Sequence, residues 1–337
     1  MTAGALLVVG ATSGAGKSTV VAGLGRRFAR DGSSVAPFKA QNMSNHSAVT
    51  DDGGEIGRAQ AMQAAACGVR PERAMNPVLL KPGAAARSHV VVDGAPAGST
   101  DARAWGSTAD RLKPHVLDAF VSLRRRFDLV VAEGAGGAAE INLLARDLVN
   151  LPLAVAAGVP AILVVDIDRG GAFAAAHGTI DLVPDRLRAP IAGIVFNRFR
   201  GDASLLDDGI ADLEARHGIP VLGVLPHLGD APLFGVEDSL DIGGEPIGDE
   251  TSSPNPLRIG VIRLPRLSNP SDIDPLVAEP DVAVSWITQP GQVADVVPVK
   301  GVVVSAGTSA LTVGVDVARV DAGRPVADVM VSPLLAP

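Results

Sequence analysis

The feature that most constrains the fold is a glycine-rich loop, GATSGAGKST, at residues 10–19. It follows the apolar run 5–10, which has the composition of a buried strand, and it opens a segment with helical character, 17–30. In this context the backbone N–H groups of the loop can surround phosphates, and the helix N-terminus adds partial positive charge. We expect Lys17 to reach the β- and γ-phosphates of a nucleotide and the Ser18 hydroxyl to bind Mg²⁺.

The alternative interpretation of this loop is a tight turn in which the glycines occur by chance. Its spacing departs from the common motif, because five residues rather than four separate Gly10 from Gly16, and Ala11 holds the usual place of the first glycine. The order of strand, glycines, Gly-Lys-Ser and helix favours a nucleotide site. Its predicted nucleotide contacts are Thr12, Ser13, Gly14, Ala15, Gly16, Lys17, Ser18 and Thr19.

Short apolar runs alternate with longer amphipathic segments along most of the chain. Such alternation is typical of βαβ units, and near-continuous apolar strands indicate a parallel sheet covered on both faces. The sequence therefore predicts an α/β fold, a mostly parallel P-loop NTPase sheet with helices on both faces. The expected strands are 5–10, 33–38, 89–93, 128–134, 160–166, 191–197, 220–225 and 257–264, and the expected helices lie near 17–30, 56–67, 108–125, 142–157, 170–182 and 204–217.

The length of 337 residues favours two domains. The stretch GDETSSPNP at 248–256 is rich in turn residues and prolines, and we expect it to be a linker. The predicted domains are 1–247, with the nucleotide loop, and 257–337, a short partial α/β segment whose last part, from about 296, is mostly Val, Ala, Gly and Pro.

Composition excludes several classes of function. The net charge of −8 argues against non-specific nucleic-acid binding, and the single cysteine, Cys67, allows neither a disulfide framework nor a cysteine-based zinc site. The longest apolar run, 151–165, is shorter than a bilayer span, so we expect a soluble, cytoplasmic protein. The histidines, at 46, 89, 115, 177, 217 and 227, show no spacing typical of metal ligands.

Acidic side chains follow two of the predicted strands. Glu133 ends the run 128–134 before a glycine-rich stretch, where a carboxylate can hold Mg²⁺ beside the phosphate loop. Glu140 is either a second metal ligand or a helix N-terminal acid. Asp166 and Asp168, after the next strand, either contact nucleotide or metal or cap a helix.

Two further features remain open on residue type alone. Asn197 ends the run 191–197, and its amide either pairs with an adenine edge or belongs to a turn. Residues 39–60 form a long polar segment directly after a predicted strand. Long loops of this kind are usually functional or disordered.

Motifs spread along the chain resemble the cobyric acid synthase family and, more distantly, dethiobiotin synthetases. They are FKAQNMSNHSAVTDDGGEIGRAQ, MNPVLLKP, EGAGGAAEINL, DLVN, DIDRGGAFA, GTIDL, NRFRGD and GIPVLGVLPHL. The resemblance covers residues 5 to about 240, and RIGVIRLPRLSNPSDIDPL continues it into the second domain. The long loop spacing is the usual one in this superfamily.

The resemblance implies an ATP-dependent amide ligase that uses Mg²⁺. Its substrate would be adenosylcobyrinic acid a,c-diamide, whose b, d, e and g carboxylates are phosphorylated and then amidated by ammonia. The polar segment 39–60 would face this corrinoid. The resemblance implies that Lys39 faces the phosphates and acts in catalysis, and that Glu55 helps to bind the metal. The residues implied to bind substrate are Gln41, Asn42, Ser44, Asn45 and Arg58. The other catalytic candidates are Lys17, Glu133 and Glu140.

The sequence departs from the family in one respect. In the family the second domain is a glutaminase that needs a catalytic cysteine, whereas Cys67 lies in an apolar segment of the first domain. The resemblance therefore implies that 257–337 is a truncated or degenerate glutamine-amidotransferase-like domain without that cysteine. We therefore expect a ligase that takes ammonia from solution or from a glutaminase partner, with oligomer formation possible. The first alternative is a non-catalytic nucleotide-binding remnant or regulator of the same family. A weaker alternative is a partition-type ATPase, because those proteins carry an extra lysine early in the loop, where this chain has Thr12 and Ser13.

Overall fold

The computed structural model describes residues 4–83, 87–228, 257–262, 274–277 and 279–287. Contacts divide the chain into two units, Met1–Asp238 and Ser239–Pro337. The predicted linker 248–256 and the segment 288–337 lie outside the described residues. None of the helices within the described ranges is long and apolar enough to cross a membrane.

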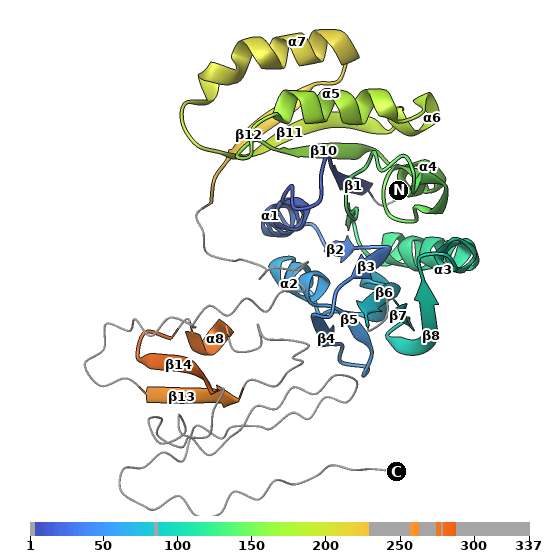
Figure 1. Ribbon diagram of the computed structural model, residues 1–337, viewed down its shortest axis with the longest axis vertical. Helices are drawn as coiled ribbons and strands as arrows, with labels where there is room; N and C mark the ends of the chain where they lie inside the picture. Colours follow the sequence, from blue (N-terminus) through green and yellow to red (C-terminus); the bar gives the residue numbers. More distant parts are fainter. Residues whose placement is uncertain (1–3, 84–86, 229–256, 263–273, 278, 288–337) are drawn as a thin grey trace, which may run out of the picture. The chain divides into compact units, whose positions relative to one another are not determined.

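The first unit is built on a six-stranded sheet in which every neighbouring pair is parallel, which confirms the predicted fold class (Figure 1). The strand order is β12-β11-β10-β1-β9-β2. The strands are β1 (Gly4–Gly10), β2 (Val35–Phe38), β9 (Leu129–Glu133), β10 (Ala161–Asp166), β11 (Ile191–Phe199) and β12 (Val221–Pro226).

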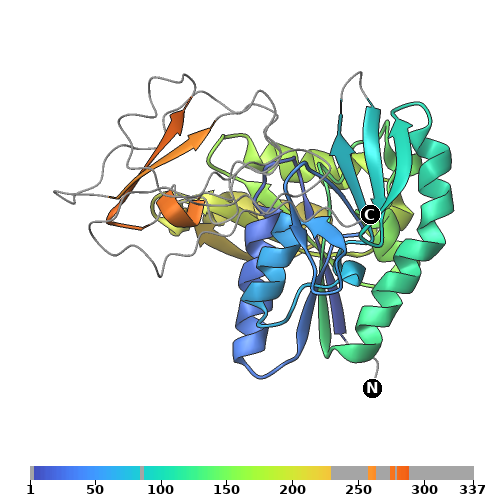
Figure 2. The ribbon, with the colours of Figure 1, turned by 90° about the horizontal axis from the view of Figure 1, so that it is seen from below.

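Helices cover both faces of this sheet. They are α1 (Lys17–Arg30), α2 (Arg58–Ala66), α3 (Trp105–Arg126), α4 (Leu151–Ala157), α5 (Ala172–Leu182), α6 (Asp185–Arg188) and α7 (Asp207–His217). Figure 2 shows α1 and α2 on one side and α3 on the other. Successive strand residues point to opposite faces, so Val8 packs in the cluster under α1 while Leu7 and Val9 pack in the cluster under α3, α4 and α5.

A smaller, mixed sheet stands beside the main one. It has the order β3-β6-β7-β8, with β3 (Gln41–Met43), β6 (Val78–Pro82), β7 (Arg87–Val92) and β8 (Ala95–Asp101). Strands β4 (Ser47–Val49) and β5 (Glu55–Gly57) pair as a separate hairpin. Short 3-10 turns occupy η1 (Arg73–Met75), η3 (Leu144–Arg146) and η4 (Ala203–Leu206).

The polar segment 39–60 is therefore not a structureless loop. It contributes three short strands and the first turn of α2, and its backbone groups bond to distant segments: Ser44 N–H to the Leu80 carbonyl and Glu55 N–H to the Gly94 carbonyl. Strands of three residues are too short to show an alternating pattern, which explains why sequence periodicity does not reveal them.

The predicted helix 142–157 is wrong in its first half. Only η3 and then α4, from Leu151, are helical in this range. The carboxylate of Asp147 accepts hydrogen bonds from the N–H groups of Val149 and Asn150, which closes a turn where a continuous helix was expected.

The second unit contributes a parallel pair, β13 (Leu257–Ile262) and β14 (Val282–Ile287), and the short helix α8 (Asp274–Val277). The strand predicted at 257–264 is thus present over 257–262. Val261 and Val284 form a small buried cluster of this unit.

Helix α1 packs against the C-terminal end of α2 at Gly25 and Cys67. A Cβ added at Gly25 would collide with the sulfur of Cys67, whereas one at the exposed Gly23 would meet nothing within 4 Å. We expect Gly25→Ala to lower the free energy of unfolding by about 1–2 kcal/mol, because overpacking outweighs the better helix propensity of alanine. Chemical denaturation measures this.

Gly23→Ala is the matched control and should raise the same free energy by up to about 1 kcal/mol. Adding Cys67→Ala to Gly25→Ala should remove the collision and recover most of the lost free energy of unfolding. A Gly25→Ala protein as stable as the Gly23→Ala protein would show that the two helices do not pack this closely.

Candidate nucleotide and phosphoryl-transfer site

The glycine-rich loop runs from the end of β1 into α1, as the sequence predicts. Gly14 and Gly16 have positive φ angles of 43° and 91°, and a Cβ at Gly16 would collide with the Asn197 amide. Residues other than glycine are strained in this conformation, so position 16 requires glycine for two reasons. The N-cap residue of α1 is Gly16, which has no side chain to cap the helix, and the N-terminus of a helix is where backbone N–H groups bind anions.

Lys17 is buried, and its ammonium is held over the loop. Nζ donates to the Gly136 carbonyl at 2.9 Å and to the Thr12 carbonyl at 3.3 Å. Gly136 lies just beyond β9, so the lysine joins the loop to the glycine-rich stretch after Glu133. This places a positive charge among backbone groups, the arrangement expected of a phosphate-binding lysine.

Glu133, the last residue of β9, is the centre of a buried polar cluster. Lys39 Nζ donates to its Oε1 at 2.8 Å, and the exposed fractions of the two side chains are 5% and 1%. The Ser18 hydroxyl donates to the same oxygen at 2.9 Å, and Gln63 Nε2 donates to Oε2 at 2.6 Å. Three of these four side chains were predicted as site residues; Gln63 was not.

The charge on Glu133 is set by two opposing effects. Burial acts to raise its pKa, but the charge and hydrogen bond of Lys39, the hydrogen bond of Gln63 and the charge of Lys17 outweigh burial, so the pKa lies below its ordinary value of 4.5. The site therefore holds a carboxylate at neutral pH. A carboxylate beside a serine hydroxyl is a set of hard oxygen donors that suits Mg²⁺.

Gln63 lies on α2, which follows the polar segment. Its side chain is fully buried, and its Oε1 accepts no hydrogen bond. One turn earlier, the equally buried Gln60 accepts from Asn42 and leaves its Nε2 without a partner. Buried amides with open hydrogen-bonding capacity are uncommon, and here two lie three residues apart on one helix. The signal in the sequence is a pair of glutamines three residues apart in an alanine-rich helix.

One polar side chain of β11, Asn197, bonds to the loop, and two aspartates at and after the end of β10 pair with arginines. Asp166 is paired with Asn197 in the β10–β11 register, and Asn197 Nδ2 donates to the Ala15 carbonyl at 2.9 Å. Asp166 accepts from Arg198 at 2.8 Å, and Asp168 pairs with Arg200 at 2.9 Å.

The alternative predictions for these residues, a helix cap for Asp166 and Asp168 and a turn for Asn197, are wrong. The N-cap position of α5 is Gly171 and has no side-chain cap, so neither aspartate caps that helix. Asn197 lies within β11 rather than in a turn. Nucleotide contacts of Asp166 and Asn197 stay predictions.

The remaining predicted residues lie in other surroundings. Glu140 is exposed in the turn between β9 and η3, and Glu55 pairs with Lys81 and accepts from Ser47 at 2.5 Å. Asn42, in β3, and Ser44, which follows this strand, are buried, while Gln41, Asn45 and Arg58 are partly exposed. Their roles at metal or substrate stay predictions.

Comparison with known proteins identifies the family. The model of the CobQ/CobB/MinD/ParA nucleotide binding domain matches residues 6–235. The chain belongs to this family. It carries the family's nucleotide-binding domain, with the glycine-rich loop and Glu133 inside the matched range.

Similar curated proteins are cobyric acid synthases. The chain is 52% identical to that of Rhodococcus jostii (strain RHA1) over 87% of the chain and 57% of the relative. It is 51% identical to that of Mycobacterium sp. (strain KMS), over 92% of the chain and 62% of the relative. It is 49% identical to that of Nocardia farcinica (strain IFM 10152), over 96% of the chain and 64% of the relative. The chain thus spans about three fifths of the length of these relatives.

Two solved structures illustrate a distant resemblance to the chain. The signal recognition particle receptor FtsY from Elizabethkingia anophelis is 16% identical over 66% of this chain and 58% of that one, with a TM-score of 0.39. MinD complexed with Mg-ADP from Pyrococcus horikoshii is 16% identical over 67% and 82%, with a TM-score of 0.34. Scores this low support no inference about the site.

The Lys39–Glu133 pair predicts a measurable stability effect. Because Glu133 is fully buried, Lys39→Met leaves an uncompensated charge and should lower the free energy of unfolding at pH 8 by about 3–5 kcal/mol. In the native protein the lowered pKa means that the pair stabilises the fold above pH 4.5 and that this contribution is lost as pH falls through the folded pKa.

In the Lys39→Met protein the carboxyl can accept a proton, so its stability should drop as pH rises from 4.5 to 8. Denaturant unfolding at both values measures the difference. Lys113→Met, which breaks the exposed pair with Asp110, is the control and should change stability by less than about 0.5 kcal/mol at either pH. An equal decrease in the free energy of unfolding in Lys39→Met and Lys113→Met would contradict the buried ion pair.

Proposed function

We propose that this chain is the ATP-dependent amide ligase part of a cobyric acid synthase. Its substrate would be adenosylcobyrinic acid a,c-diamide, converted to cobyric acid by amidation of the b, d, e and g carboxylates. The single observation that carries the proposal is the ionised Glu133 in contact with Ser18 and Lys39, beside the glycine-rich loop. The identity of about 50% to cobyric acid synthases supports the substrate class.

The proposed reaction has two steps. A substrate carboxylate oxygen attacks the γ-phosphorus of ATP, ADP leaves, and an acyl phosphate forms. Ammonia then attacks the acyl carbon, phosphate leaves with the former carboxylate oxygen, and the nitrogen loses a proton to solvent. Neither step needs a protein nucleophile, because positioning and charge neutralisation are sufficient for phosphoryl transfer.

Each residue of the cluster has a distinct part in this scheme. The loop N–H groups and Lys17 bind the β- and γ-phosphates, and Asn197 holds the loop from behind through the Ala15 carbonyl. Ser18 and Glu133 would hold Mg²⁺, which when bound neutralises charge on the phosphate oxygens. Lys39 supplies a second positive charge next to Glu133.

The amides on α2 are suited to the substrate side. The open Oε1 of Gln63 can accept a hydrogen bond, and the open Nε2 of Gln60 can donate one. A corrinoid that carries both carboxylates and amides offers groups of both kinds. Asn42 donates to Gln60, and Gln63 donates to Glu133. The two glutamines of α2 therefore connect the polar segment to the carboxylate of the proposed Mg²⁺ site.

The first functional prediction concerns Glu133→Gln. The amide keeps the size of the side chain but removes the charge that a divalent cation needs. We expect amidation to fall at least about 100-fold, with nucleotide affinity changed by less than about 10-fold, when turnover and nucleotide binding are measured over a Mg²⁺ titration.

Glu72→Gln is the matched control, because Glu72 pairs with Arg126 on α3 and should leave turnover as in the native protein. A Mg²⁺ dependence in Glu133→Gln identical to that of the native protein would exclude the metal role. ATP hydrolysis that proceeds equally without corrinoid would favour a partition-type ATPase instead.

The second functional prediction concerns the nitrogen source. Burial raises the pKa of the Cys67 thiol to about 11, so this cysteine is not a nucleophile at neutral pH. We expect the 337-residue chain to amidate with ammonium salts, faster at higher pH where more NH₃ is free, and not with glutamine. Product formation and glutamate release measure the two sources separately.

Cys67→Ser should alter neither rate, since the thiol takes no part in the reaction. Release of glutamate from glutamine by the native chain, stopped by Cys67→Ser, would show that Cys67 acts as a glutaminase nucleophile and would contradict this prediction.

A further inference from the structure

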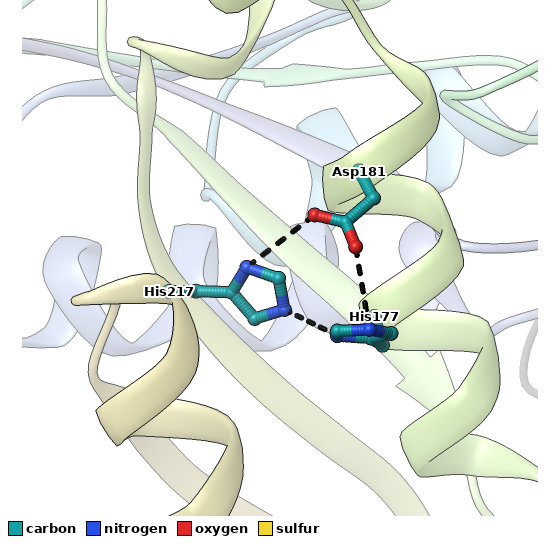
Figure 3. Close-up of side chains that lie close together, drawn as sticks. All are labelled: His177, Asp181 and His217. Carbon is teal, nitrogen blue, oxygen red and sulfur yellow. Dashed lines mark hydrogen bonds and ion pairs between the residues drawn. The ribbon is translucent and has the colours of Figure 1, made fainter.

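Two helices on one face of the main sheet bring three metal-ligating side chains together. His177 and Asp181 lie one turn apart on α5, and His217 is the last residue of α7. One ligand atom from each lies within 4.8 Å of the others (Figure 3). Because 40 residues separate the two histidines, their spacing along the sequence gives no sign of this cluster.

The three side chains point at one another. His177 Nδ1 lies 2.7 Å from His217 Nε2, and the Asp181 carboxylate lies 3.2 Å from His177 Nε2 and 3.8 Å from His217 Nδ1 (Figure 3). Two imidazole nitrogens at 2.7 Å must share one proton, so the contact is one hydrogen bond between groups that are both able to bind a cation. The carboxylate on one side of both rings adds an oxygen donor.

Burial fixes one of the three ligands, and the other two remain accessible. The side chain of His217 is only 5% exposed, and its ring is fixed between the two helices. His177 and Asp181 are 44% and 51% exposed, which leaves one side open to water. Three protein ligands with one open position is the arrangement of many zinc sites that keep a bound water.

We propose that His177, Asp181 and His217 bind a divalent transition-metal ion, with Zn²⁺ as the best match, and that the ion fastens α5 to α7. Two nitrogens and one carboxylate oxygen form a donor set that suits Zn²⁺ and other late first-row ions better than Mg²⁺. Two nitrogens bound to one tetrahedral ion lie about 3.3 Å apart, so the half-exposed His177 ring has to move by about half an ångström.

This inference does not depend on the proposed function. The Mg²⁺ site proposed there uses oxygen donors of Ser18 and Glu133, whereas this cluster lies on α5 and α7 and uses imidazole nitrogen. An ion here would stabilise the fold around β11 and β12 without taking part in amidation.

The test uses Co²⁺ and Zn²⁺ on the full chain after treatment with a chelator, with excess Mg²⁺ present to fill oxygen-donor sites. We expect one Co²⁺ to bind per chain with the visible absorption of a low-coordinate, nitrogen-ligated ion and to be displaced by one Zn²⁺. At 100-fold excess over its dissociation constant, Zn²⁺ should raise the thermal midpoint by about 5–10 °C.

His177→Gln and Asp181→Asn, both partly exposed, should keep the fold by circular dichroism. His177→Gln should abolish the absorption and the thermal shift, and Asp181→Asn should weaken binding at least about 10-fold. His115→Gln is the matched control, because His115 lies on α3 and pairs with Asp93 at 2.8 Å, so this variant should bind Co²⁺ like the native protein. Absence of Co²⁺ absorption in the native chain, or full absorption in folded His177→Gln, would overturn the proposal.

Discussion

The buried ion pair between Lys39 and Glu133 organises the centre of this protein. Lys39 follows β2, Glu133 ends β9, and the same carboxylate accepts hydrogen bonds from Ser18 on α1 and Gln63 on α2. Two strands and two helices therefore meet at one charged group. Because an unpaired carboxylate is very costly at this depth, any arrangement of these elements that separates Glu133 from its partners is strongly disfavoured.

This constraint also explains why the polar segment is ordered. Lys39 opens the segment and Gln63 comes three residues after its end, so both ends are fixed to Glu133. Between them, short strands pair with segments as far along the chain as Gly94, and Asn76 donates to the Lys39 carbonyl. The start of the segment and the helix at its end are thus both held at the carboxylate that also accepts a hydrogen bond from Ser18 of the glycine-rich loop.

The sheet and the nucleotide loop could be predicted from the sequence because both are local. Each central strand is an apolar run, and the glycine-lysine-serine order is specific to phosphate binding. Glu133 could be predicted since parallel strands end at one edge. Gln63 could not, because an amide on an alanine-rich helix has no distinctive pattern. The three-residue strands β3, β4 and β5 could not either, because they are too short to show a period. The run predicted as a strand at 89–93 is present as β7, but it belongs to the smaller sheet and pairs antiparallel with both of its neighbours. The partnership of His177 with His217 depends on two separate helices packing together, which no local pattern encodes.

The fate of one oxygen atom tests the proposed function most directly. The corrinoid diamide would be labelled with ¹⁸O in its free carboxylates and incubated with the protein, ATP, Mg²⁺ and ammonium, and the released phosphate analysed by mass spectrometry. If the carboxylate is phosphorylated and then amidated, one ¹⁸O appears in phosphate for each amide formed. Amide formation with unlabelled phosphate, or phosphate release without amide, would contradict the account.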